Sequence, residues 1–171
     1  SWSRNEPCEV VAVWGVDPAM FIAATQGFPK NVSELDFIGG LTGRPVELCK
    51  GQVVSLPYPA RAEIVMEGII YPNAVKKEGP FGEFTGYYGR PEDVTFLVEV
   101  KAVHYRENPI LTHALMADYP ACESALLYSI ARSARVWNDL DRLGVPGIKG
   151  VYAQPAAGVL GMTIVSLEQR Y

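Results

Sequence analysis

Two glutamates on either side of a short turn are the residues of this sequence best suited to acid–base chemistry. Glu78 and Glu83 flank residues 79–82, Gly-Pro-Phe-Gly, which neither a helix nor a regular strand accommodates. A spacing of five would place their side chains on opposite faces of a strand, whereas a turn can direct both toward one pocket. At about 5 Å their repulsion would be roughly 3 kcal/mol at an effective dielectric of about 20. This corresponds to about two pKa units, enough to keep one carboxyl protonated near neutral pH.

A protonated carboxyl beside an ionised one is suited to delivering a proton to carbon. One group donates the proton and its partner restores it. The competing interpretation of Glu78 and Glu83 is a solvated loop in which both side chains point outward. The residues alone leave both interpretations open.

Glu34 is a further acidic candidate. It follows Ser33 in a segment that resembles a capping box, and a first-turn glutamate interacts favourably with the helix dipole without any other role. Its carboxylate is alternatively a ligand for a hard metal ion, since Mg²⁺ and Mn²⁺ prefer oxygen donors. His104 and His113 have no other metal-binding residue at ligand spacing, so we expect both to be structural.

Composition narrows the class of protein. A chain of 171 residues with 49% hydrophobic and 20% charged residues is typical of one globular domain. A net charge of -4 without a basic block argues against nucleic acid as a partner. Three scattered cysteines argue against a disulfide scaffold or a cysteine-ligated zinc site. We find neither a signal peptide nor an apolar run long enough to cross a bilayer, and expect a cytoplasmic protein without membrane contact.

Patterns typical of strands dominate the chain. β-Branched and aromatic residues cluster in short runs separated by proline and glycine. We expect strands over residues 10–14, 46–49, 53–56, 63–70, 94–105 and 159–167. The sheet should be antiparallel with one wet face, because Glu99 and Lys101 alternate with apolar residues.

Helix signals are fewer. Asp17 followed by proline predicts a helix over residues 19–25. Ser33 begins a short helix that we expect the glycine pair at 39–40 to end.

A long amphipathic helix is expected from about residue 122 to 143, ended by Gly144. Its apolar side is predicted to consist of Leu126, Leu127, Ile130, Ala131 and Ala134. Strands with a few helices indicate an α+β protein that is mostly β, with the sheet curled or closed.

The segment from Glu78 to Tyr88, Glu-Gly-Pro-Phe-Gly-Glu-Phe-Thr-Gly-Tyr-Tyr, resembles the signature of the UbiD family. This family comprises reversible decarboxylases that use prenylated FMN. The resemblance extends in order over residues 11–18, 33–43, 59–68, 100–111 and 165–171. It implies that residues 1–171 form a single domain, the middle domain of a longer enzyme. In that family it is a split β-barrel similar to flavin reductases, between a cofactor-binding N-terminal domain and a dimerising C-terminal one.

The resemblance also implies roles for the acidic residues. Glu83 matches the proton donor to the substrate carbon, and Glu78 matches its partner near the flavin in a Glu–Arg–Glu network. Glu34 matches the glutamate that binds the divalent metal, typically Mn²⁺, at the cofactor phosphate. The arginine and the remaining metal ligands would belong to the preceding domain. We therefore expect this chain alone to fold but not to catalyse.

Four further residues take a role by resemblance. Thr25 and Gln26 match positions that face the cofactor and a bound K⁺, although Gln26 replaces the apolar residue expected in the ferulic acid decarboxylase branch. Phe84 and Tyr128 match substrate-lining positions. The substrate implied is an aromatic or α,β-unsaturated carboxylic acid, and the full-length protein is expected to be a homo-oligomer. The alternative is a stand-alone split-barrel binding or assembly module without catalysis.

Overall fold

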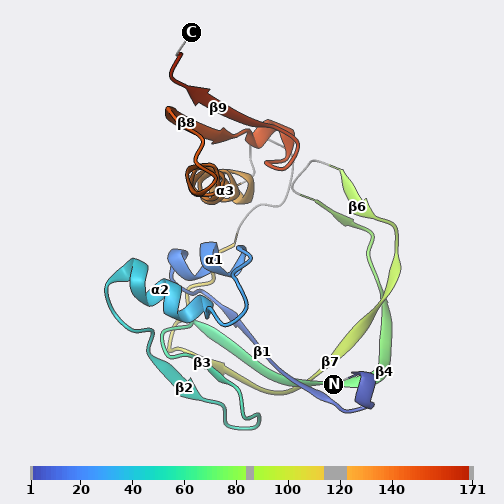
Figure 1. Cartoon of the computed structure of the whole chain (residues 1–171). Coiled ribbons are helices and arrows are strands. Elements are labelled where there is room, and N and C mark those ends of the chain that lie inside the picture. Colours follow the sequence, from blue (N-terminus) through green and yellow to red (C-terminus); the bar gives the residue numbers. More distant parts are fainter. Residues whose placement is uncertain (1, 84–86, 114–122, 170–171) are drawn as a thin grey trace. The chain divides into compact units, whose positions relative to one another are not determined.

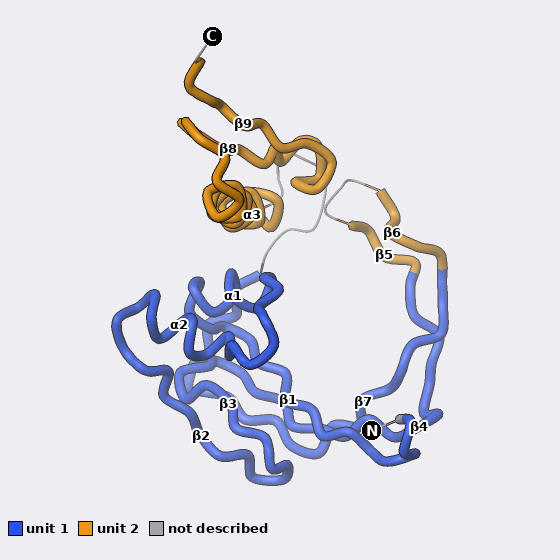
Figure 2. Tube along the Cα trace, viewed as in Figure 1, with its two compact units in different colours: residues 1–79, 92–113 blue, residues 80–91, 114–171 orange. Residues whose placement is uncertain are grey.

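The computed structural model describes residues 2–83, 87–113 and 123–169 (Figure 1). The chain divides into two compact units (Figure 2). The first consists of residues 1–79 and 92–113, and the second of residues 80–91 with the described part of 114–171. The described residues are mostly β with few helices, as predicted. Within the described part, no helix is long and apolar enough to span a membrane.

The first unit is built on an antiparallel sheet in the order β1-β4-β7. The central strand β4 (Ile64–Glu78) pairs on one side with β1 (Cys8–Trp14), which follows a short 3₁₀ turn (Trp2–Arg4), and on the other with β7 (Asp93–Tyr105). Strands β4 and β7 bend together (Figure 1), and their register shifts after Glu67 and again after Ile70.

Glycine is required at the first of these shifts. A Cβ on Gly68 would lie 2.7 Å from Val98 Cγ1 and 2.8 Å from the carbonyl oxygen of Glu99. The two strand backbones can therefore approach at the bulge only because this residue has no side chain.

A small hairpin of β2 (Leu48–Lys50) and β3 (Pro57–Pro59) belongs to the same unit. The strand predicted over residues 53–56 is wrong, because residues 52–55 form bends instead. The physical reason is that the N–H groups of residues 52–54 bind the buried carboxylate of Glu67 rather than a neighbouring strand.

Two short helices, α1 (Pro18–Ala24) and α2 (Glu34–Thr42), contact one another in the first unit. Both begin as predicted, since the Asp17 carboxylate accepts from Ala19 N at 2.8 Å and Ser33 Oγ accepts from Leu35 N at 3.2 Å. The predicted end of α2 at residues 39–40 is wrong. The helix ends only at Gly43, which has the left-handed conformation at a φ of 71°.

The second unit contains a hairpin of β5 (Phe81–Gly82) and β6 (Tyr88–Arg90). It also contains α3 (Glu123–Arg142) beside a second hairpin of β8 (Ile148–Ala153) and β9 (Thr163–Leu167), with the 3₁₀ turn η2 (Pro155–Ala157) between the strands. The strand predicted from residue 159 begins only at Thr163, because Val159 is buried with a positive φ of 65°.

Helix α3 matches its predicted length, but its predicted apolar side is not the side that packs within the second unit. Leu126 and Ile130 are exposed by 50% and 67%. The buried residues of α3 are Ser124, Ala125 and Ser129. Small residues face β8 because the Ser129 hydroxyl donates to the Ala153 carbonyl at 2.5 Å, which requires a close approach of helix and strand.

Candidate functional site

Thr25 and Gln26 lie at the C-terminal end of α1, where the structure brings them together. The Thr25 hydroxyl donates to the carbonyl of Ile22 at 2.7 Å and accepts from Gln26 Nε2 at 2.8 Å. Both residues are half-buried. The amide of Gln26 is thus oriented by its neighbour, and this end of α1 presents a fixed set of oxygen atoms.

Glu34 is the first residue of α2, and it is exposed. A carboxylate at this position interacts favourably with the helix dipole, and its exposure leaves it accessible to a metal ion. Among the described residues, no three carboxylate, histidine or cysteine side chains form a group that could hold a metal. Glu34 can therefore contribute one ligand, and this part of the chain does not complete a metal site.

The two glutamates of the signature lie where the turn was predicted. Glu78 is the last residue of β4, opposite Asp93 of β7. Glu83 follows β5, is half-buried, and its N–H donates to the carbonyl of Tyr87 at 2.7 Å. Glu78 belongs to the first unit and Glu83 to the second, and their cooperation as an acid pair stays a prediction.

The two predicted substrate-lining residues have different outcomes. Phe84 lies outside the described residues. Tyr128 lies on α3, where its half-buried ring packs against a cluster of Ala125, Ala153 and Val159. One side of the ring is therefore fixed by the core of the second unit, and its contact with a substrate stays a prediction.

Sequence reasoning missed the most buried carboxylate of the first unit, that of Glu67. Its side chain is fully buried in β4. Oε1 accepts from Gln52 N at 2.9 Å and from His104 Nε2 at 2.7 Å, and Oε2 accepts from Val53 N at 2.8 Å and Val54 N at 2.9 Å. An ionised carboxylate only accepts, so the proton shared with His104 resides on the ring nitrogen. The signal was present in the sequence, where Glu67 interrupts an apolar run of the strand.

These donors hold Glu67 in its charged form. Burial by itself raises the pKa of this carboxyl, but the three backbone N–H groups and His104 lower it to about 2. His104 also stacks on Tyr58, with ring centroids 6.0 Å apart, which fits the structural role expected for this histidine. Because all four donors come from the fold and no surface of Glu67 is accessible, this carboxylate anchors a loop rather than acting on a substrate.

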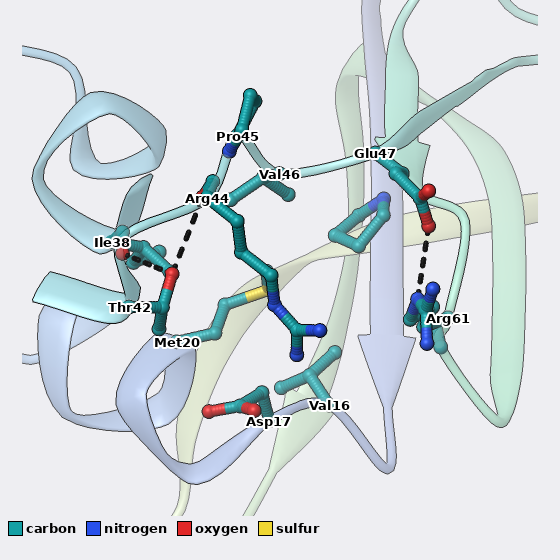
Figure 3. Close-up of a pocket in the computed structure, with 12 residues that line it drawn as sticks. Val16, Asp17, Met20, Ile38, Thr42, Arg44, Pro45, Val46, Glu47 and Arg61 are labelled. Atoms are coloured by element: carbon teal, nitrogen blue, oxygen red, sulfur yellow. Dashed lines mark hydrogen bonds and ion pairs between the residues drawn. The ribbon is translucent and has the colours of Figure 1, made fainter. Parts of the chain in front are cut away.

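The first unit also contains a pocket of about 90 Å³ between α1, α2 and the segment leading to β2 (Figure 3). Figure 3 shows the side chain of Arg44 extending along it toward Asp17 and Met20. On its rim the exposed pair of Arg61 and Glu47 is joined at 2.9 Å. None of the described residues to which the sequence assigned a catalytic, cofactor, metal or substrate role lines this pocket.

Comparison with known proteins decides the family. The family model described as the UbiD 3-octaprenyl-4-hydroxybenzoate carboxy-lyase Rift-related domain matches residues 1–119. The chain belongs to the UbiD family. The resemblance predicted from the segment Glu78–Tyr88 is thereby confirmed.

The UbiD relatives are much longer than this chain. An uncharacterized protein of Archaeoglobus fulgidus is 34% identical over 163 residues, which are 95% of this chain and 33% of the relative. The UbiD-class enzyme HmfF from Pelotomaculum thermopropionicum, in complex with prFMN, is 36% identical with a TM-score of 0.87, covering 99% of this chain and 39% of HmfF. The 3,4-dihydroxybenzoic acid decarboxylase AroY of Klebsiella pneumoniae is 31% identical with a TM-score of 0.86, covering 99% and 36%. The chain is thus related to UbiD-class decarboxylases and spans between 33% and 39% of these relatives.

Proposed function

We propose that this chain is the part of a prenylated-FMN-dependent decarboxylase that supplies the acid–base glutamates and one metal ligand. The likeness to HmfF, a UbiD-class enzyme solved with prFMN, carries the proposal, because it covers 99% of this chain. Its substrate would be an aromatic or α,β-unsaturated carboxylic acid. In this UbiD chain the residues available for proton transfer are Glu78 and Glu83, on either side of the turn.

In the proposed reaction, the bond between the substrate carbon and its carboxylate breaks and CO₂ leaves. Prenylated FMN, when bound, supplies the electron-accepting group that makes this cleavage possible. Glu83 then gives its proton to the carbon that lost CO₂, so that the product carries hydrogen in place of the carboxylate. A proton taken up from solvent then restores the acid form of Glu83, with Glu78 as its partner in the network, and prepares it for the next turnover.

This chain contains some of the ligands that the two metal ions of the proposed cofactor site would need. The exposed carboxylate of Glu34 is the hard oxygen donor that Mn²⁺ prefers. The oxygen atoms of Thr25 and Gln26, fixed at the end of α1, are suited to K⁺. Further ligands for Mn²⁺ would have to come from outside the described residues, since these contain no group of three carboxylate, histidine or cysteine side chains that could hold a metal.

Replacement Glu83→Gln in the complete enzyme that contains this chain tests the proposal. Gln keeps the shape but has no acidic proton, so we expect turnover to fall by at least about 10²-fold while flavin binding is retained. Release of CO₂ and flavin absorbance would be measured in parallel. The matched control is Glu92→Gln, an exposed glutamate paired with Lys77, which should change turnover less than about twofold. Normal turnover by Glu83→Gln would remove Glu83 from the donor role.

A further inference from the structure

Gly89 occupies an unusual place in the β5–β6 hairpin. Phe81 pairs with Arg90 and Gly82 pairs with Tyr88, with a register shift between the two pairs. Gly89 is therefore the extra residue of a bulge, the irregularity by which strands redirect a neighbouring side chain.

The usual reason for glycine does not apply to this residue. Gly89 is absent from the described residues with a positive φ, so alanine could adopt its backbone conformation. A glycine that does not need a positive φ weakens a strand, and its presence there indicates that another group approaches the backbone closely. The group that approaches is the side chain of Glu83. A Cβ on Gly89 would lie 3.3 Å from Glu83 Oε2, 3.5 Å from its Cβ and 3.7 Å from its Cγ.

From these contacts we infer that Gly89 is a positioning residue for the Glu83 carboxyl group. The side chain of Glu83 runs along the bare backbone of the bulge, from its Cβ to its carboxylate. Any side chain at residue 89 displaces the carboxylate oxygen, because 3.3 Å is closer than a Cβ normally comes to such an atom. The inference rests on the proposed function, in which Glu83 is the proton donor, and adds the residue that sets the position of the acid.

The effect on catalysis follows from distance. Proton transfer requires the acid and the accepting carbon at hydrogen-bond range, and a misplacement of about 1 Å costs about 10²-fold in rate. Gly89→Ala requires a shift of only a few tenths of an ångström, so we expect kcat to fall by about 10-fold. KM should stay within about twofold, because Gly89 acts on the acid and not on substrate binding.

The experiment compares Gly89→Ala, Gly89→Val and Glu83→Gln in the complete enzyme, with kcat, KM and the pH profile of kcat measured for each. The loss of kcat should be larger for Gly89→Val than for Gly89→Ala. The limb of the kcat pH profile that reports the proton donor should shift relative to the wild type. The matched control is Gly150→Ala, because Gly150 also lies in a strand beside a register shift and its Cβ would approach only Ser166 Cβ, at 4.0 Å. This control should retain wild-type kcat.

A second measurement does not depend on activity. In the chain itself, with glutamate carboxyl carbons labelled with ¹³C, Gly89→Ala should shift the carboxyl resonance of Glu83 and leave that of Glu34 unchanged. An unchanged Glu83 resonance together with wild-type kcat in Gly89→Ala would overturn the inference even where Glu83→Gln is inactive. Normal turnover by Glu83→Gln would instead refute the proposed function, so the two failures are distinguishable.

Discussion

Glu67 should make the first unit sensitive to acid in a defined range of pH. The pKa of this carboxyl is lowered from its ordinary value of 4.5 to about 2 by donors that exist only in the folded chain. A group with a lowered folded pKa stabilises the fold above its unfolded pKa, and this stabilisation is lost as the pH falls toward the folded pKa. Each pKa unit is worth about 1.4 kcal/mol, so the charged form of Glu67 contributes about 3 kcal/mol above pH 5.

The variant Glu67→Gln isolates this contribution. Gln is a neutral group of the same size, and its NH₂ would face backbone N–H donors that now bind a carboxylate oxygen. We expect a loss of at least about 3 kcal/mol at pH 7, because a buried charged hydrogen-bond network is broken. The free energy of unfolding would be measured by urea denaturation, followed by circular dichroism, at intervals between pH 7 and pH 2.5.

The pH dependence of the difference is the sharper test. The difference in stability between wild type and Glu67→Gln should be constant above about pH 5 and shrink by about 1.4 kcal/mol per pH unit below it. Titration of the other carboxyls cancels in this difference. The control is Glu47→Gln, whose exposed pair with Arg61 should be worth less than about 1 kcal/mol. A difference that does not change with pH would refute the assignment of stability to the charge on Glu67.

Two other substitutions have defined outcomes. Ser129→Ala removes the buried hydroxyl that donates to the Ala153 carbonyl and should destabilise the second unit by about 1–2 kcal/mol; urea denaturation within about 0.3 kcal/mol of wild type would contradict this. Gly15→Ala should cost about 2 kcal/mol or more, because residue 15 has a φ of 65° and a Cβ there would collide with the side chain of Glu63 and lie 2.9 Å from the Ile110 carbonyl oxygen. A thermal midpoint unchanged within about 1 °C would show that the backbone relaxes freely at this turn.

The sequence predicted correctly those elements that are determined by interactions between residues close together in the chain. The strand at residues 94–105 and the helix starts at Asp17 and Ser33 follow from residue periodicity and capping, which act within a few residues. The glycine pair at 39–40 did not end α2, because glycine only lowers helix propensity and Gly43 satisfies the end of the helix three residues later.

Long-range contacts explain what the sequence could not predict. Residues 53–56 have the composition of a strand, but the N–H groups of residues 52–54 bind Glu67, some fifteen residues away. Leu126 has the character of a core residue, yet the close packing of α3 on β8 selects the small residue Ser129 instead. The turn around Glu83 was predicted from composition, whereas the bulge that places Gly89 against it depends on strand register and had no signal in the sequence.

The anchoring of the loop at residues 52–54 has a consequence for the order of folding. Its contact with Glu67 also involves His104, which β4 and β7 bring opposite Val65 only when they pair. The complete set of donors thus cannot form before a hairpin that spans some forty residues has closed. We therefore expect the segment at residues 52–54, which is not paired with a strand, to reach its full stability only after that hairpin has closed.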